Sequence, residues 1–154
     1  MYVGKKVTRV DAYDKVIGRT KYTDDLCDKS AYIAQVLHST IAHGRVVSID
    51  TSEAEKIPGV IRVFTCFDVK EKHYFPTAGH PWSTDPGHQD VADRLVLTEE
   101  VRFYGDDIAA VVAEDEVSAA QAIRAIKVEH EENPFVLDVQ EAMKEGAPQI
   151  HEKY

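Results

Sequence analysis

The stretch AYIAQVL, residues 31–37, constrains the possible folds more than any other part of the sequence. Successive side chains of a strand point to opposite faces of its sheet, and here both sets are apolar except for Gln35. A strand with one face in water alternates apolar and polar residues, whereas a strand covered on both faces is a continuous apolar run. The sequence therefore predicts a central strand that is buried on both sides.

A short helix and a second strand are predicted next. Asp50 can cap the helix, with Glu53 three residues further on, and Pro58 with Gly59 ends it. The apolar run VIRVF (60–64) then indicates a strand. Together with the first strand, these segments predict a strand–helix–strand unit.

Two more strands are indicated by EVRFY (100–104) and IAAVVA (108–113). The three residues between them, 105–107, include a glycine, and a connection of this length favours a β-hairpin. We therefore expect these two strands to pair with each other.

The last third of the chain predicts two helices and a strand. Asp115 is a typical N-cap for a helix of about ten residues, and residues 126–131 alternate apolar and polar side chains as a half-buried strand does. Asp138 with Glu141 forms a capping box for a final helix that ends at Gly146. The fold class predicted is α/β (α+β): a mixed sheet with two main flanking helices and a short one, in a single domain over residues 1–154.

Composition excludes several classes of function. Eighteen Lys and Arg against 27 Asp and Glu give a net charge of -9, and no basic patch is present that could bind nucleic acid. No apolar run approaches the roughly 20 residues of a membrane span, and the N-terminus lacks a signal peptide, so we expect a cytoplasmic protein. Cys27 and Cys66 form no C-x-x-C motif, and we expect both to be reduced and buried.

The segment from residue 67 to residue 94 has no sustained period of either kind, and loops of this length tend to be functional or disordered. Its centre is FPTAGHPWSTDPGHQD (75–90), which contains the only tryptophan of the chain. The spacing of its histidines is not a recurring zinc arrangement, so a metal site is disfavoured. The candidate ligands would be His73, His80, Asp85, His88 and Asp90.

The other residues that could form a catalytic group each have a structural explanation. Ser39 and His43 are close in sequence, with Thr40 between them, but no carboxylate can be assigned to orient the histidine. Asp106 and Asp107 could be paired carboxylates, yet aspartates are common in turns for backbone reasons. No glycine-rich phosphate cradle is present. The residues therefore predict no catalytic, cofactor-binding or metal-binding group.

Four motifs together resemble the N-terminal α/β hammerhead domain of the molybdenum-binding large subunit of the xanthine dehydrogenase and aldehyde oxidase family. The combination is far more specific than any one motif, and the bacterial xanthine dehydrogenases are the most similar branch. The motifs are D-A-x-x-K-V-x-G (11–18), S-x-x-A-H-x-x-V (39–46), P-G-V-x-x-V (58–63) and G-D-x-x-A-A-V-V-A-E (105–114).

The chain departs from the family pattern at two positions. His130 stands where the family has an aromatic residue, and Gly44 stands where alanine is usual. From its place on the apolar face of its strand, we expect His130 to be a core histidine with its hydrogen bonds satisfied.

The resemblance implies a non-catalytic structural domain, excised from a longer subunit that hydroxylates purines such as xanthine or hypoxanthine with oxygen from water. The molybdenum–pterin cofactor, iron–sulfur clusters and FAD would belong to the complete enzyme, so the chain alone would be inactive. Its partners would be the molybdopterin-binding domains of the same subunit and the iron–sulfur and FAD subunits or domains, with no nucleic acid and no membrane.

The resemblance also assigns a role to the long loop: residues 76–88 correspond to a wall of the substrate funnel. The wall residues would be Phe75, Pro76, His80, Pro81, Trp82 and His88. The alternative is a free-standing acidic interaction or metal-binding module that uses the histidines of residues 73–90.

Overall fold

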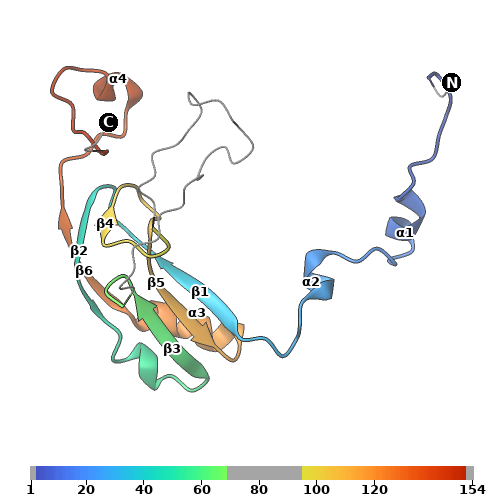
Figure 1. The fold of residues 1–154 in the computed structure, drawn as a ribbon, viewed down its shortest axis with the longest axis horizontal. Coiled ribbons are helices and arrows are strands. Elements are labelled where there is room, and N and C mark those ends of the chain that lie inside the picture. Colours follow the sequence, from blue (N-terminus) through green and yellow to red (C-terminus); the bar gives the residue numbers. More distant parts are fainter. Residues whose placement is uncertain (1–2, 69–94, 152–154) are drawn as a thin grey trace. The chain divides into compact units, whose positions relative to one another are not determined.

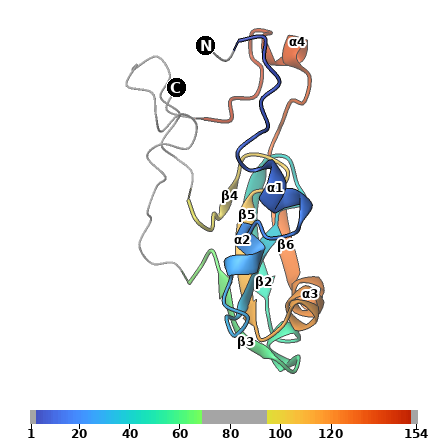
Figure 2. The same ribbon diagram turned by 90° about the vertical axis from the view of Figure 1, so that its right-hand side faces the viewer.

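The structure, a computed structural model, describes residues 3–68 and 95–151 (Figures 1 and 2). The chain divides into two compact units, residues 1–31 and residues 32–154, which are described here one at a time. The elements of the second unit carry almost all of the buried core.

The first unit contains two short helices, α1 (Ala12–Val16) and α2 (Thr23–Leu26). Gly18 ends α1 with φ 71°, a left-handed conformation that glycine adopts without a steric penalty. The backbone N–H of Arg19 then donates to the carbonyl of Asp14, which closes the last turn. Neither helix has a buried residue, so each is held by local contacts.

The second unit contains two three-stranded sheets with antiparallel pairing between the described strands. The first sheet has the order β1-β5-β3 and the second has the order β4-β2-β6. The elements are β1 (Ile33–His38), β2 (Gly44–Asp50), the 3₁₀ helix η1 (Ala54–Lys56), β3 (Val60–Thr65), β4 (Glu100–Val101), β5 (Asp107–Ala113), α3 (Glu116–Ala125), β6 (Lys127–Glu132) and α4 (Val139–Ala142).

Helix α3 covers one face of the β1-β5-β3 sheet (Figure 2). Asp115 is its N-cap, as predicted: the Asp115 carboxylate accepts hydrogen bonds from the backbone N–H of Ser118 at 2.8 Å and from its hydroxyl at 2.9 Å. Ala119 and Ala122 are fully buried on the inner face of the helix. Small side chains at these positions allow α3 to approach the sheet closely.

The core consists of two clusters of buried apolar residues. Both clusters take a residue from β5, and partly buried Leu37, Ile49 and Val128 pack against both. The first cluster lies under α3 and contains Ala54, Val63, Val111, Ala122 and Ile126. The second lies between the two sheets and contains Ile41, Val46, Val101 and Ile108.

The α/β fold class is confirmed, but its sheet arrangement differs from the expectation. The strands form two antiparallel sheets in place of one mixed sheet, and β1 is an edge strand of its sheet and not a central one. The predicted hairpin between residues 100–104 and 108–113 is wrong, because β4 pairs with β2 while β5 pairs with β1 and β3.

Two helices are also shorter than predicted. The helix after Asp50 is a single 3₁₀ turn, because the Asp50 carboxylate accepts from the N–H of Ser52 and not from a helical residue. The final helix α4 has four residues and none is buried, although Asp138 caps it as predicted. The main flanking helix among the described elements is therefore α3.

Gly44 lies where β2 runs closest to β6. A Cβ atom at this position would lie 2.2 Å from the carbonyl oxygen of Glu131, well inside van der Waals contact. The alanine that is usual in the family would therefore require the two strands to separate in this chain.

Candidate functional site

The predicted wall residues all lie in the segment 69–94, outside the described residues. The candidate metal ligands of the same loop lie there as well. The described residues on either side of this segment are called the anchor of segment 69–94: residues 65–68 before it and 95–98 after it.

The first side of the anchor is a tight turn at the end of β3. The Asp68 carboxylate accepts hydrogen bonds from the hydroxyl of Thr65 at 2.8 Å and from its backbone N–H at 2.7 Å. These two bonds lower the pKa of Asp68 because they stabilise its charged form. The backbone N–H of Cys66 donates to the carbonyl of Ile108 at 3.0 Å, which ties this turn to β5.

The second side of the anchor is also tied to β5. The backbone N–H of Thr98 donates to the carbonyl of Asp107 at 2.8 Å, and the buried Thr98 hydroxyl donates to the carbonyl of Glu100. One residue further, the carbonyl of Glu99 accepts from the N–H of Val46 on β2. Cys66 before segment 69–94 and Thr98 after it are thus bonded to neighbouring residues of one strand, Ile108 and Asp107.

The turn before β5 is organised by Asp106, which is buried. Its carboxylate accepts from the N–H of Arg102 at 2.8 Å and from that of Phe103 at 3.4 Å. Its carbonyl accepts from the N–H of Ser39, and the carbonyl of Ser39 accepts from the N–H of Gly105. Asp106 therefore fixes the chain reversal that sends residues 100–101 and 107–113 into different sheets.

Asp106 and Asp107 contact different groups. The Asp107 carboxylate lies 2.9 Å from Nδ1 of His38 on the neighbouring strand, whereas the Asp106 carboxylate accepts from backbone N–H groups of its own turn. The turn explanation for Asp106 is consistent with these contacts, and the paired-carboxylate explanation has no support from them.

Ser39, Thr40 and His43 are not arranged as a nucleophile and its base. The buried Ser39 hydroxyl bonds to the backbone of Ile41, accepting from its N–H at 3.2 Å. The His43 ring bonds through Nδ1 to the carbonyl of Pro134 at 2.8 Å, and the His43 carbonyl accepts from the N–H of Asn133. These contacts join the β1–β2 connection to the chain that follows β6.

The prediction that the hydrogen bonds of His130 are satisfied is wrong for one of its ring nitrogens. Nε2 of His130 is buried and has no hydrogen-bond partner in the structure. His130 lies on β6, opposite Val46 of β2, so its ring packs in an apolar setting as its place in the sequence pattern indicates.

The two cysteines differ in environment. Cys27 is exposed, contrary to the expectation of a buried thiol, while Cys66 is half-buried. Burial raises the pKa of the Cys66 thiol to about 11, and the nearby negative charge of Glu99 adds to this effect. A thiol of this kind is a poor nucleophile and a poor metal ligand at neutral pH.

The described residues contain no cluster of side chains that could hold a metal ion. Within residues 3–68 and 95–151, no three His, Cys, Asp or Glu side chains are gathered closely enough to hold a metal ion. The cysteine nearest the anchor stays protonated at neutral pH.

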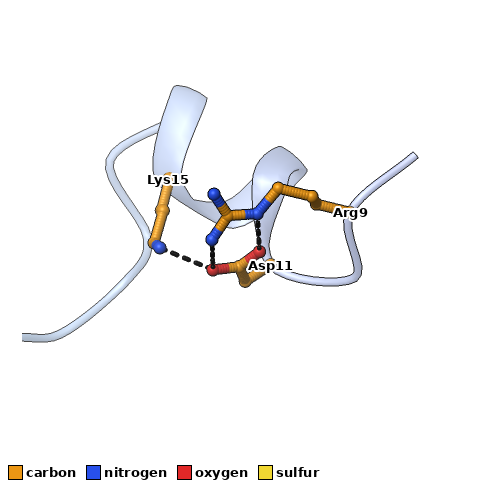
Figure 3. Close-up of polar contacts among 3 residues, drawn as sticks. All are labelled: Arg9, Asp11 and Lys15. Atoms are coloured by element: carbon orange, nitrogen blue, oxygen red, sulfur yellow. Dashed lines mark hydrogen bonds and ion pairs between the residues drawn. The ribbon is translucent and has the colours of Figure 1, made fainter. Parts of the chain in front are cut away.

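A charged cluster in the first unit explains part of the D-A-x-x-K-V-x-G motif (Figure 3). The Asp11 carboxylate accepts two hydrogen bonds from the guanidinium of Arg9, at 3.1 and 3.0 Å, and one from Nζ of Lys15 at 2.5 Å. Lys15 and then Arg9 lower the pKa of Asp11 by stabilising its charged form. All three side chains are exposed, so this cluster holds α1 locally and is not a buried site.

Comparison with known proteins decides the family. The sequence matches the model of the family described as aldehyde oxidase and xanthine dehydrogenase, a/b hammerhead domain, over residues 17–134. The chain belongs to this family. It is also 44% identical, over 143 residues, to the xanthine dehydrogenase molybdenum-binding subunit of Escherichia coli O157:H7, a match that covers 93% of this chain and 19% of that protein.

Solved structures show the same hammerhead fold. The aldehyde oxidoreductase from Desulfovibrio gigas aligns with a TM-score of 0.78 at 35% identity, covering 97% of this chain and 16% of that one. The quinoline 2-oxidoreductase from Pseudomonas putida 86 aligns with a TM-score of 0.82 at 30% identity, covering 100% of this chain and 19% of that one. The hammerhead chain thus spans less than a fifth of the length of these relatives.

No helix among the described residues of the hammerhead is long and apolar enough to cross a membrane.

Replacing Asp106 with alanine removes the acceptor of two backbone N–H groups in a buried turn. We expect Asp106→Ala to lower the free energy of unfolding by about 1–3 kcal/mol. The neighbouring Asp107→Ala is the control, because it breaks only a partly exposed ion pair and should cost less than about 1 kcal/mol. Urea denaturation measures both. Equal losses in the two variants would contradict the role assigned to Asp106.

The two thiols should differ in their reaction with a disulfide reagent, because only the thiolate attacks. With a pKa of about 11, the Cys66 thiolate forms only as the pH rises above 9. We expect one fast thiol at pH 8, lost in Cys27→Ser, and a second, at least about 10-fold slower, whose rate still increases between pH 9 and 11. A fast phase that survives in Cys27→Ser at pH 8 would refute this assignment.

Proposed function

We propose that this hammerhead is a non-catalytic structural domain of a larger molybdenum-binding subunit of the xanthine dehydrogenase type. The observation that carries the proposal is the use of its polar residues. Ser39, His43, Thr98 and Asp106 bond to the backbone of the domain itself, so these four polar side chains hold the fold.

The degree of similarity to different relatives supports a proposal for the substrate class. Identity is 44% to a xanthine dehydrogenase molybdenum-binding subunit, against 34% to the carbon monoxide dehydrogenase large chain of Afipia carboxidovorans. We infer that the parent enzyme hydroxylates purines such as xanthine or hypoxanthine in the cytoplasm. The molybdenum–pterin cofactor of its other domains would supply the oxidation, and iron–sulfur and FAD partners would carry the electrons away.

The contribution of this domain would be one wall of the substrate funnel, made by Phe75, Pro76, His80, Pro81, Trp82 and His88. The anchor supports this proposal, because residues 66 and 98 are bonded to neighbouring carbonyl groups of β5. Holding both ends of a long segment at one point of a sheet reduces the entropy lost when the segment is ordered.

A domain exchange tests the proposed function. Residues 1–154 would replace the matching region of the putative xanthine dehydrogenase molybdenum-binding subunit XdhA of Escherichia coli (strain K12), which is 43% identical over 143 residues. We expect the chimera to retain molybdenum and to hydroxylate xanthine, because the reacting groups lie outside the exchanged region.

Two controls make the exchange decisive: the XdhA subunit without the matching region, and the 154-residue chain alone. Both should be inactive, and metal analysis of the chain alone should find no bound metal. Purine hydroxylation by the chain alone, or a chimera without molybdenum where the unmodified subunit has it, would overturn the proposal. One equivalent of zinc in the chain alone would favour a metal-binding module.

The wall role of the long segment has its own test in the chimera. Trp82→Ala should raise the KM for xanthine about tenfold and change kcat less than about twofold, because a wall binds substrate and transition state alike. Tyr104→Ala is the matched control, since Tyr104 is an exposed aromatic residue outside the segment. Unchanged KM in Trp82→Ala, or the same rise in both variants, would exclude Trp82 from the wall.

A further inference from the structure

Among the described residues of the second unit, the β1-β5-β3 sheet has one face that keeps exposed side chains. Helix α3 packs on the inner face, whereas the opposite face, called the outer face, remains accessible. Strand register places its residues in two rows across the sheet. The rows are Val36–Ala110–Phe64 and Ala34–Val112–Arg62.

The outer face is apolar at its centre. Val36 is 40% exposed and Phe64 is 38% exposed, and between them lies the small side chain of Ala110. A row of this kind on a three-stranded sheet is a flat apolar surface. Contiguous apolar surface of this sort, when it is left in water, marks a site of contact with other protein.

The ionisable groups of the outer face already have partners. His38 and Asp107 form a pair, 2.9 Å between Nδ1 and Oδ1, at one end of the sheet. The guanidinium of Arg62 lies over the ring of Phe64, 5.2 Å from its centroid, as in a cation–π contact. Arg62 keeps its positive charge in this contact, so a partner that covers the outer face would have to accommodate that charge.

The sequence pattern agrees with a covered outer face. Strands β1 and β5 are apolar on both faces, a pattern typical of strands that are buried on both sides. The structure buries only one side of β1. The predicted central place of β1 in its sheet is wrong, because β1 is an edge strand. The sequence pattern also predicts that both faces of β1 are covered, and in the structure the side chains of one face are exposed.

We propose that the outer face docks against an apolar surface of another domain of the same molybdenum-binding subunit. This inference rests on the proposed function. The relatives supply the occupant, because the matched region is 19% of the xanthine dehydrogenase subunit and 16% of the aldehyde oxidoreductase chain. A second copy is disfavoured, because two chains that each carry a net charge of -9 repel one another.

Thiol labelling tests this docking in the chimera and in the 154-residue chain. The background variant is Cys27→Ser, which removes the exposed thiol, and the remaining Cys66 is slow because of its raised pKa. Val36→Cys places a probe on the outer face. Val47→Cys is the matched control: it is a valine of similar exposure, 50%, on β2 of the other sheet.

The surroundings of the control differ from those of the probe. Strand β2 carries Arg45, paired with Glu131, and Ser48, bonded to Glu129. A surface with these polar pairs is not expected to be covered by an apolar partner. We expect a maleimide to label both probes at similar rates in the chain alone. In the molybdenum-containing chimera, labelling of Val36→Cys should slow at least about tenfold while labelling of Val47→Cys stays within about threefold.

The outcomes separate the two proposals. Equal labelling of Val36→Cys in the chain and in a chimera that holds molybdenum would overturn the docking and leave the proposed function standing. Protection of Val36→Cys in the chain alone that increases with its concentration would identify a second copy as the occupant, and would also overturn the docking. A chimera that never acquires molybdenum would overturn the proposed function, and the docking with it.

Discussion

Strand β5 pairs with β1 on one side and with β3 on the other, and its side chains are apolar on both faces. This strand supplies Val111 to the core under α3 and Ile108 to the second cluster, so the two clusters depend on the same strand. Burial of such side chains is the main source of stability in a domain of this size. Strands β1 and β3 and helix α3 are held in position by their contacts with β5.

The same strand also links the fold to the proposed function. The carbonyl groups of Asp107 and Ile108 accept from Thr98 and Cys66, which lie on opposite sides of segment 69–94. The outer face of the sheet, with Val36 and Phe64, offers a surface for the rest of a larger subunit. In the proposed function, such a domain would supply the shape of a binding site, while the reacting groups would come from other domains.

Local signals in the sequence predicted local structure well. Asp115 caps α3 as its position indicates, and the alternation of residues 126–131 gives β6. The local patterns of the sequence did not predict the contacts between residues that are far apart in the chain. The hairpin prediction failed because buried Asp106 and Ser39 form a turn that joins distant parts of the chain. Strand β2 was missed, and its register shift near Val46 interrupts the regular pairing.

The position of β1 shows a different limit of sequence patterns. An apolar run on both faces reports that a strand is covered, but not what covers it or where the strand lies in its sheet. The candidate site has the same limit, because the family motifs could be recognised in the sequence while the wall residues lie outside the described residues. The unsatisfied Nε2 of His130 has no signal in the sequence pattern that could have found it.

The central claim is that this hammerhead is one part of a longer molybdenum-bearing polypeptide. The most direct measurement is the intact mass and the molybdenum content of the natural gene product that carries residues 1–154. The account predicts a polypeptide several times longer than 154 residues that contains molybdenum. A natural product that ends at Tyr154 and associates with no molybdenum-containing protein would contradict it.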